Sequence, residues 1–162
     1  MANLITSAQG IDHVTSRQDA HWHRKLLGED NWHNLNPDTI VTDHSEIQFD
    51  AFVGCLQGRF FDTEETTTLY ADLTDDFGFY RRDAVCYRIT NGATQSGDFV
   101  FIQGEQASSS NPPYPEILQG DLDAGDNQAL LPLFYILAQY RSVEIDKVVN
   151  QYNGLVSAEI SV

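Results

Sequence analysis

Basic residues and long apolar runs are both scarce in this sequence. Nine lysines and arginines stand against 24 aspartates and glutamates, so the net charge is -15. Such a surplus of negative charge opposes binding to phosphate backbones, and we expect no nucleic-acid partner. No run approaches the ~18 apolar residues of a membrane-spanning helix, and the N-terminus lacks a basic segment followed by an apolar one. We therefore expect neither membrane insertion nor a signal peptide.

Cysteine is also rare, with only Cys55 and Cys86 present. Each lies in a strand-like run with apolar neighbours, which predicts buried free thiols; a disulfide and a reactive thiol remain as alternatives. The chain of 162 residues fits one domain, and a chain of about 150 residues buries roughly 68–70% of its unfolded surface. A core of that size needs neither a disulfide nor a structural metal, and we expect no cofactor.

The most informative stretch runs from Ser45 to Asp62. Hydrophobic residues alternate over Ile47 to Leu56, a period that predicts a single β-strand. Apolar residues interrupt the polar face as well, so this strand is expected near the middle of a sheet. Gly58 is expected to bend the chain directly afterwards.

Further strand patterns follow at short intervals. In Arg82–Thr90, Ala84 and Cys86 alternate with Val85, Tyr87 and Ile89, which predicts a strand with two distinct faces. The other predicted strands begin near Ile40 or cover Thr66–Leu73, Asp98–Gln103, Leu133–Tyr140 (directly after Pro132, and apolar on both faces) and Val143–Ile145, while Glu29–Pro37 and Glu105–Pro115 are predicted loops. Short strands separated by turn residues predict a mainly β fold, an antiparallel sandwich or barrel-like domain.

The N-terminal segment has a different character. Polar residues precede a helix predicted over Arg17–Leu27, which Thr15 or Ser16 caps and Gly28 ends. A helix this short is marginal by itself, so it must dock on the sheet or on another subunit. We therefore divide the chain into an assembly element over residues 1–28, an arm and a short α-helix, and a β domain over residues 29–162. The expected assembly contacts are Ile5, His13, Val14, Trp22, Leu26 and Leu27.

Two groups of residues are weak candidates for metal binding. His21 and His23 would point to opposite sides of a helix, so one chain cannot bring them to one ion, although a symmetric oligomer could. Asp121, Asp123 and Asp126 resemble a calcium loop, but the glycine falls one place early and Pro132 replaces the terminal glutamate. A solvated turn is therefore the default interpretation, and we expect no metal.

The sequence contains no nucleophile elbow, phosphate-binding loop, dinucleotide fingerprint or CxxC pair. Paired carboxylates for sugar cleavage remain a hypothesis, with Glu64–Glu65, Asp75–Asp76 and Asp83 as the candidates. In a chain with 24 acidic residues some pairing arises by chance, so we expect no enzyme. Another hypothesis is a carbohydrate-binding module in which aromatic faces stack on sugar rings. Its candidates are Trp22, Trp32 and Tyr114.

Six short blocks in a fixed order resemble tail and baseplate proteins of phages and prophages of Gram-positive bacteria. The first is ITSAQGIDHVTSRQDAHWHRKLLG, at Ile5 to Gly28. A strand ending in QGR, at Ser45 to Arg59, comes second. The other blocks are the R-x-D-x-V-x-x-R pattern at Arg81–Arg88, a short strand that closes on a glycine turn, VFIQG, at Val100–Gly104, QGDLDAGD at Gln119–Asp126 and PLF at Pro132–Phe134.

The resemblance implies a non-enzymatic virion protein: a mostly β adaptor in the tail that holds fibres or receptor-binding modules. It implies a homo-oligomer, a trimer or a hexamer, with other tail or baseplate proteins and a host cell-surface glycan as further partners. The sequence departs from the family in Glu29–Pro37, which lacks the usual hydrophobic stretch after the helix. Many relatives continue beyond the position of Val162 into a fibre region, so we expect a stand-alone spacer or the N-terminal module of a longer protein.

Overall fold

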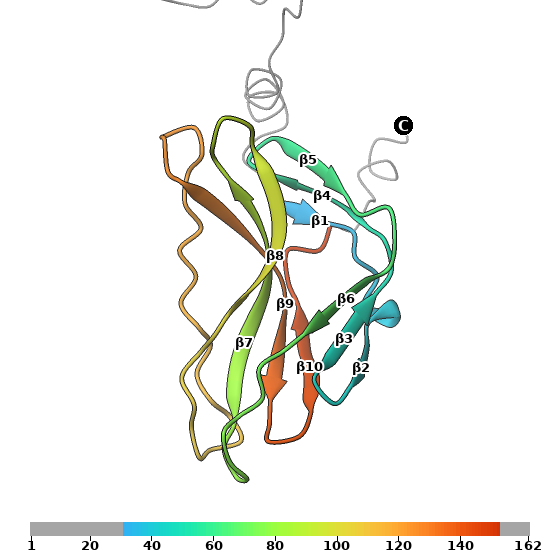
Figure 1. Ribbon diagram of the computed structural model, residues 1–162, viewed down its shortest axis with the longest axis vertical. Coiled ribbons are helices and arrows are strands. Elements are labelled where there is room, and N and C mark those ends of the chain that lie inside the picture. The colour runs from blue at the N-terminus through green and yellow to red at the C-terminus, as the bar shows by residue number, and fades with distance from the viewer. Residues whose placement is uncertain (1–30, 153–162) are drawn as a thin grey trace, which may run out of the picture.

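The computed structural model describes residues 31–152, which contain ten strands and one turn of 3-10 helix (Figure 1). In chain order they are β1 (Trp32–His33), η1 (Pro37–Thr39), β2 (Val41–Asp43), β3 (Glu46–Phe49), β4 (Val53–Leu56), β5 (Arg59–Asp62), β6 (Thr67–Tyr70), β7 (Arg81–Thr90), β8 (Ser96–Ile102), β9 (Gln128–Ala138) and β10 (Val143–Val148). The predicted N-terminal helix and all six predicted assembly residues lie outside the described part.

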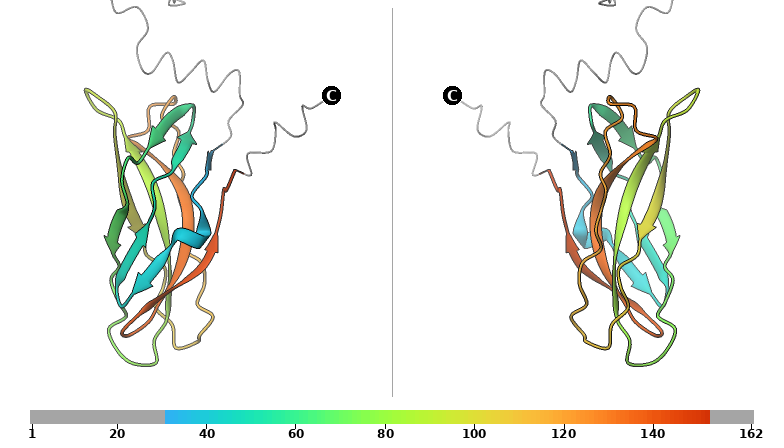
Figure 2. Two further views of the ribbon diagram at one scale, coloured as in Figure 1. Left: turned by 90° about the vertical axis from the view of Figure 1, so that its right-hand side faces the viewer. Right: turned by 90° about the vertical axis from the view of Figure 1, so that its left-hand side faces the viewer.

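The strands form three antiparallel sheets that pack together as a β-sandwich-like domain (Figures 1 and 2). One sheet has the order β10-β9-β7-β8, and the other two are β2-β3-β6 and β1-β4-β5. Phe49 of β3 contacts Phe99 of β8 and Phe134 of β9, with ring centroids 5.5 and 5.8 Å apart. These rings join the small sheets to the four-stranded sheet across the main core. The predicted mainly β, antiparallel fold is confirmed.

The four-stranded sheet is buried on both faces. Val85 and Ile89 of β7 point into the main core, while Ala84 and Cys86 form a second cluster with Leu130 on the opposite face. The irregular segment between β8 and β9 covers this second cluster, where its Ile117 packs. The predicted alternation along β7 is confirmed, as is the two-sided burial of β9.

The single strand predicted over Ile47–Leu56 is wrong, because the chain breaks between β3 and β4. Ile47 and Phe49 are buried, but the alternation then changes phase, with Ala51 exposed and Phe52 buried. At the break, the amide of Phe52 donates to Oγ1 of Thr63 at 2.9 Å instead of to a neighbouring strand. Each half is nevertheless the central strand of a three-stranded sheet, as the pattern predicts.

The turn predicted at Gly58 is confirmed and is a two-residue β-hairpin. Leu56 pairs with Arg59, and the two turn residues, Gln57 and Gly58, have φ angles of 51° and 79°. Positive φ at both positions matches the twist of the flanking strands, and glycine adopts it without steric cost.

Two predicted element boundaries need correction. The predicted loop Glu29–Pro37 contains β1, which pairs with β4 through Trp32 and Cys55. The strand predicted to begin after Pro132 instead runs through it, because β9 shifts register between Pro132 and Phe134 against β7. A β-bulge of this kind is one of the few places in a sheet that accommodate proline.

Candidate binding pocket at the distal end

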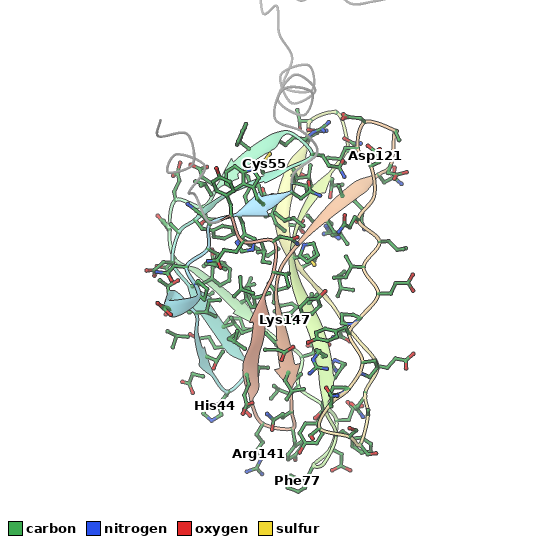
Figure 3. All side chains as sticks on the ribbon, turned by 180° about the vertical axis from the view of Figure 1, so that it is seen from behind. His44, Cys55, Phe77, Asp121, Arg141 and Lys147 are labelled. Atoms are coloured by element: carbon green, nitrogen blue, oxygen red, sulfur yellow. The ribbon has the colours of Figure 1, made fainter. Side chains whose placement is uncertain are left out.

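The two ends of the sandwich differ. We call the end at which the described residues begin and end the chain-terminal end, and the opposite end the distal end. At the chain-terminal end, β1 begins beside Tyr152, whose amide donates to the carbonyl of His33 at 2.7 Å. Cys55 lies at this end, whereas Phe77 and Arg141 lie at the opposite, distal end (Figure 3). The distal end consists of the loop that precedes β7, the turn between β9 and β10, and the first part of the segment after β8 (Figure 1).

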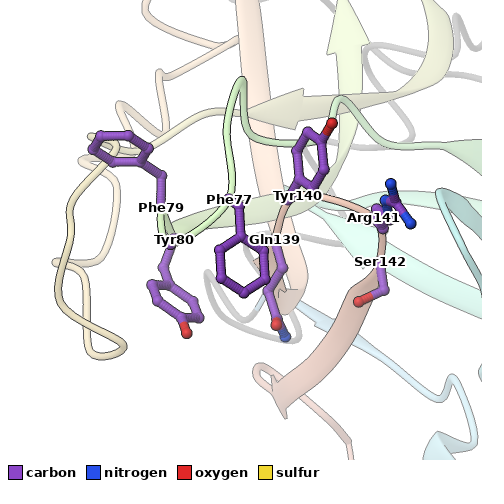
Figure 4. Close-up of a pocket in the computed structure, with 8 residues that line it drawn as sticks. Phe77, Phe79, Tyr80, Gln139, Tyr140, Arg141 and Ser142 are labelled. Carbon is purple, nitrogen blue, oxygen red and sulfur yellow. The ribbon is translucent and has the colours of Figure 1, made fainter.

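A pocket of about 530 Å³ opens at the distal end (Figure 4). Two short segments that are far apart in the sequence line it, and both connect to the four-stranded sheet. The lining residues are Phe77, Gly78, Phe79 and Tyr80 from the first segment, and Gln139, Tyr140, Arg141 and Ser142 from the second.

Hydrogen bonds hold the first segment in place. The backbone amide of Thr74 donates to the carbonyl of Gln139 at 3.0 Å, and its hydroxyl donates to the carbonyl of Phe79 at 3.1 Å. Tyr80 and Ala107 exchange two backbone hydrogen bonds of 2.8 Å. Because three different segments are tied together at this point, the pocket exists before any ligand arrives.

The aromatic rings of the pocket are unusually open to solvent. The exposed fraction of Phe77 is 85%, and Phe79 and Tyr140 are also exposed. In Figure 4 the ring of Phe77 lies between Tyr80 and the side chain of Gln139. A pocket lined by aromatic faces beside amide and hydroxyl groups is a candidate ligand site.

The predicted stacking residues belong to other clusters. Trp32 packs against Tyr152, with ring centroids 4.9 Å apart, and edge-on against Phe60 at 6.1 Å. Tyr114 lies in the segment after β8, where the Arg82 guanidinium and the Lys147 ammonium approach its ring centroid to 4.3 and 4.4 Å. Trp22 lies outside the described residues.

The aspartates of the predicted calcium-like turn serve the turn itself. Asp121 Oδ1 accepts from the amides of Asp123 and Ala124, and Asp126 Oδ2 accepts from the amide of Asp121 at 2.7 Å. Asp123 also forms an ion pair with Arg59 at 2.9 Å. Among residues 31–152 no three histidine, cysteine or acidic side chains gather as metal ligands. His21 and His23 are outside that range.

His33 is buried at the chain-terminal end, where it joins the first and last strands. Its Nδ1 accepts from the amide of Leu35 at 3.2 Å, so its Nε2 carries the proton and donates to the carbonyl of Val149 at 2.6 Å. Burial lowers the pKa of His33, because the charged imidazolium is poorly solvated there. The ring is thus a neutral structural link.

Asp83 and the two cysteines are buried and engaged within the fold. Asp83 is buried, accepts two hydrogen bonds from Arg81 at 2.7 and 2.8 Å, and also accepts from the amide of Gly104. Cys55 and Cys86 are both buried, as predicted. Burial raises the pKa of Cys86 to about 12, so this thiol stays protonated at neutral pH.

A second hollow, near the break between β3 and β4, contains Asp50 and Asp62. Much of its polar lining already serves the backbone, since Asn34 accepts from the amide of Val53 and Thr63 accepts from that of Phe52. The distal pocket is therefore the stronger candidate. Sequence reasoning placed only a turn at Asp75–Phe79, although three aromatic residues around a glycine, in DFGFY, signal rings that a turn cannot bury.

The chain matches no protein-family model, and a search of curated proteins finds no match. Within residues 31–152, no helix has the length and apolar character to cross a membrane.

Proposed function

We propose that this protein is a non-enzymatic structural component of a phage tail tip or baseplate, an oligomeric adaptor that holds fibres or receptor-binding modules. The proposal starts from the six collinear sequence blocks that resemble such proteins. It is supported by the parts that those blocks play in the fold and by the contrast between the two ends of the sandwich.

Two blocks distant in sequence form one hydrogen-bonded unit. Gln57, in the QGR block, donates from Nε2 to the carbonyl of Gly120 at 2.8 Å and accepts at Oε1 from the amide of Leu122 at 2.9 Å. Arg59 of the same block pairs with Asp123. The QGR and QGDLDAGD blocks therefore stabilise each other. The polar side chains of the two blocks hold the fold together in this way, which fits a structural role for these blocks and not a catalytic one.

Two further blocks meet at the start of β7. Arg81 and Asp83 of the R-x-D pattern form a buried ion pair, and Asp83 accepts from the amide of Gly104 at 3.1 Å. A Cβ atom at position 104 would collide with the carbonyl of Arg82, so this glycine allows the close approach of two backbones. The spacing of these blocks thus follows from the fold itself.

The observation that carries the adaptor proposal is the position of the exposed aromatic residues at opposite ends. At the chain-terminal end, Trp32 packs with Tyr152 and with Phe60, whose exposed fraction is 51%. We name Trp32, Phe60 and Tyr152 the terminal aromatic cluster. Tyrosine, tryptophan and phenylalanine are enriched at protein interfaces. In the proposal this end docks on a neighbouring subunit, together with residues 1–28, and the distal end points outward.

A second candidate function is carbohydrate binding at the host surface. The distal pocket favours it, because the exposed rings of Phe77 and Tyr140 lie beside the polar groups of Gln139 and Ser142. Aromatic platforms with a few polar groups bind sugar rings well. An adaptor that also binds a receptor combines both functions.

The first experiment is a solution mass by light scattering behind a sizing column, with and without EDTA. A stable trimer or hexamer supports the adaptor, and dissociation by EDTA would implicate a metal, with His21 and His23 as the first candidates. A monomer that stays unassembled in the presence of tail proteins contradicts the assembly proposal.

The interface is tested by two substitutions of exposed aromatic residues. Phe60→Ser should shift the mass toward the monomer, because it removes a ring from the terminal aromatic cluster. Tyr70→Ser is the matched control, since Tyr70 is 67% exposed but lies on β6, away from that cluster. Deleting Met1–Gly28 should abolish the oligomer and keep the β signal in circular dichroism. An unchanged mass after this deletion would rule out residues 1–28 as the assembly element.

A further inference from the structure

The arginines of the described residues differ in their partners, and Arg141 is the exception. Within residues 31–152, four arginines form ion pairs with a carboxylate, namely Arg59 with Asp123, Arg81 with Asp83, Arg82 with Asp146 and Arg88 with Asp98. In the same part of the chain no such ion pair involves Arg141. Its guanidinium lies 5.4 Å from the ring centroid of Tyr140. In a chain with net charge -15, an arginine that has no carboxylate partner among residues 31–152 is a candidate to bind a negatively charged ligand.

The charge of the pocket is opposite to that of the protein. Its eight lining residues include one cation, Arg141, and no carboxylate. Asp75 and Asp76 directly precede the first segment, and Asp76 Oδ1 accepts from the amide of Phe77 at 2.8 Å. On the other side, Glu144 follows the second segment in β10. Arg141 therefore places one of the nine basic residues of the chain among the residues that line the distal pocket.

Within residues 31–152, the neighbour of the Arg141 guanidinium is the ring of Tyr140, and no hydrogen bond of this guanidinium is found there. A guanidinium that lies against an aromatic face can still donate hydrogen bonds in its own plane. Two of these donors at a time match the oxygens of a carboxylate or phosphate. Phe77 and Tyr80 provide apolar faces for a sugar ring, and Gln139 and Ser142 provide polar groups for its hydroxyls. An apolar ligand would form no hydrogen bond with the guanidinium, and a neutral sugar would not interact with its positive charge.

We infer that the distal pocket binds an acidic saccharide, with the carboxylate or phosphate of the ligand on Arg141 and a sugar ring on Phe77. This inference rests on the proposal that the pocket binds carbohydrate and adds the charge class of the ligand. The geometry also assigns different tasks to the two residues. Phe77 contributes to the binding of any sugar ring, whereas Arg141 distinguishes acidic saccharides from neutral ones.

The test measures binding of the full chain to a printed panel of oligosaccharides that carry uronate, sialate or phosphate groups, each beside its neutral counterpart. Affinities are then measured in solution for the best acidic member and its neutral partner. We expect acidic members to bind at least about tenfold more tightly, the difference that one well-formed charged hydrogen-bond pair provides. Carboxylate-bearing and phosphate-bearing members of the panel distinguish the two sources of negative charge.

Three variants separate the steps of the argument. Arg141→Gln should abolish the preference for acidic members, and Arg141→Lys should restore only part of it, because lysine keeps the charge without the paired donors. Phe77→Ala should weaken binding of all members. Arg88→Gln is the control, because Arg88 is a partly exposed arginine on β7 outside the pocket, and this variant should bind like the wild type.

Each outcome decides between the two claims. Equal binding of acidic and neutral members, or an acidic preference that survives in Arg141→Gln, overturns the inference and leaves carbohydrate binding intact. If the full chain binds no member of the panel, both the inference and the carbohydrate proposal fail. Circular dichroism of each variant separates a loss of binding from a loss of folding, and the side chains of Phe77 and Arg141 are exposed, so their substitution should leave the fold intact.

Discussion

The chain-terminal end and the distal end of the sandwich use similar residues to different effect. At the chain-terminal end, Trp32 of β1 and Phe60 of β5 both lie opposite Cys55 of the intervening strand β4, and their rings contact each other edge-on. At the distal end, Phe77 and Tyr140 lie on loops that backbone hydrogen bonds hold open around a pocket. Strands bring aromatic rings together into a cluster, whereas tied loops keep them apart and accessible. The first arrangement suits contact with another protein surface, and the second suits a small ligand.

The strongest test of this contrast removes the support of the distal end. Arg81→Ala should lower the free energy of unfolding by about 3–5 kcal/mol, because it leaves a buried carboxylate without its cation. The side chains of Arg81 and Asp83 are only 9% and 1% exposed. Urea denaturation measures the loss. Arg88→Ala is the control: its pair with Asp98 is 33% and 50% exposed, and its removal should cost only about 0–1 kcal/mol. Equal losses would show that the buried pair has no special role.

The corresponding support at the chain-terminal end is the side chain of Gln57. Gln57→Ala should lower the free energy of unfolding by about 1–3 kcal/mol, because the buried amide of Leu122 and the carbonyl of Gly120 lose their partner. Gln48→Ala removes only an exposed hydrogen bond to Thr68 and is the control. The same denaturation experiment compares the two. A loss as small as that of the control would mean that the side chain of Gln57 does not couple the two sequence blocks.

The pH dependence of stability should originate partly at the chain-terminal end. Burial lowers the pKa of His33, so below its ordinary value of 6.5 the unfolded chain binds a proton that the folded chain does not. The contribution of His33 to the free energy of unfolding is therefore fully present above about pH 6.5 and decreases as the pH falls below that value. Thermal melts between pH 7.5 and 5.5 should show a smaller decrease for His33→Gln than for the wild type. His44→Gln, at an exposed histidine, should match the wild type, and an unchanged decrease in His33→Gln would exclude this histidine as the cause.

The smallest effect on stability is expected at the distal pocket. Phe77→Ala should change the free energy of unfolding by no more than about 0.5 kcal/mol, because the ring is 85% exposed. Phe49→Ala, in the main core, should cost about 3–5 kcal/mol by leaving a cavity. A large loss in Phe77→Ala would indicate that this ring supports the fold and is not reserved for a ligand.

Much of the sheet could be predicted from local pattern. The alternation of Val85 and Cys86 along β7 specifies opposite faces, and Gln57–Gly58 specifies a tight turn. The break between β3 and β4 could not be predicted, because the alternation in the sequence continues through Asp50–Phe52 and only the burial of the side chains changes phase. Likewise β1 has two residues, too few for any period, and depends on pairing with Cys55 far along the chain.

The candidate site was harder to predict than the fold. Trp32 and Tyr114 are aromatic residues in polar segments, a pattern that also fits ligand-binding rings, but each packs within a separate cluster. The pocket instead joins Phe77 and Tyr140, which are more than sixty positions apart in the sequence and meet only because their loops end adjacent strands. No local pattern encodes that meeting. The residue that decides the charge of the pocket, Arg141, is distinguished only by the partners of the other arginines.

The hydrogen bonds that shape the distal loops have a consequence for how this protein can vary. Most of them join backbone groups, as between Thr74 and Gln139 and between Tyr80 and Ala107. Backbone bonds are indifferent to the identity of the exposed side chains beside them. The rings and the arginine of the pocket can therefore be exchanged while the loops keep their course, so new ligand preferences can arise on an unchanged scaffold.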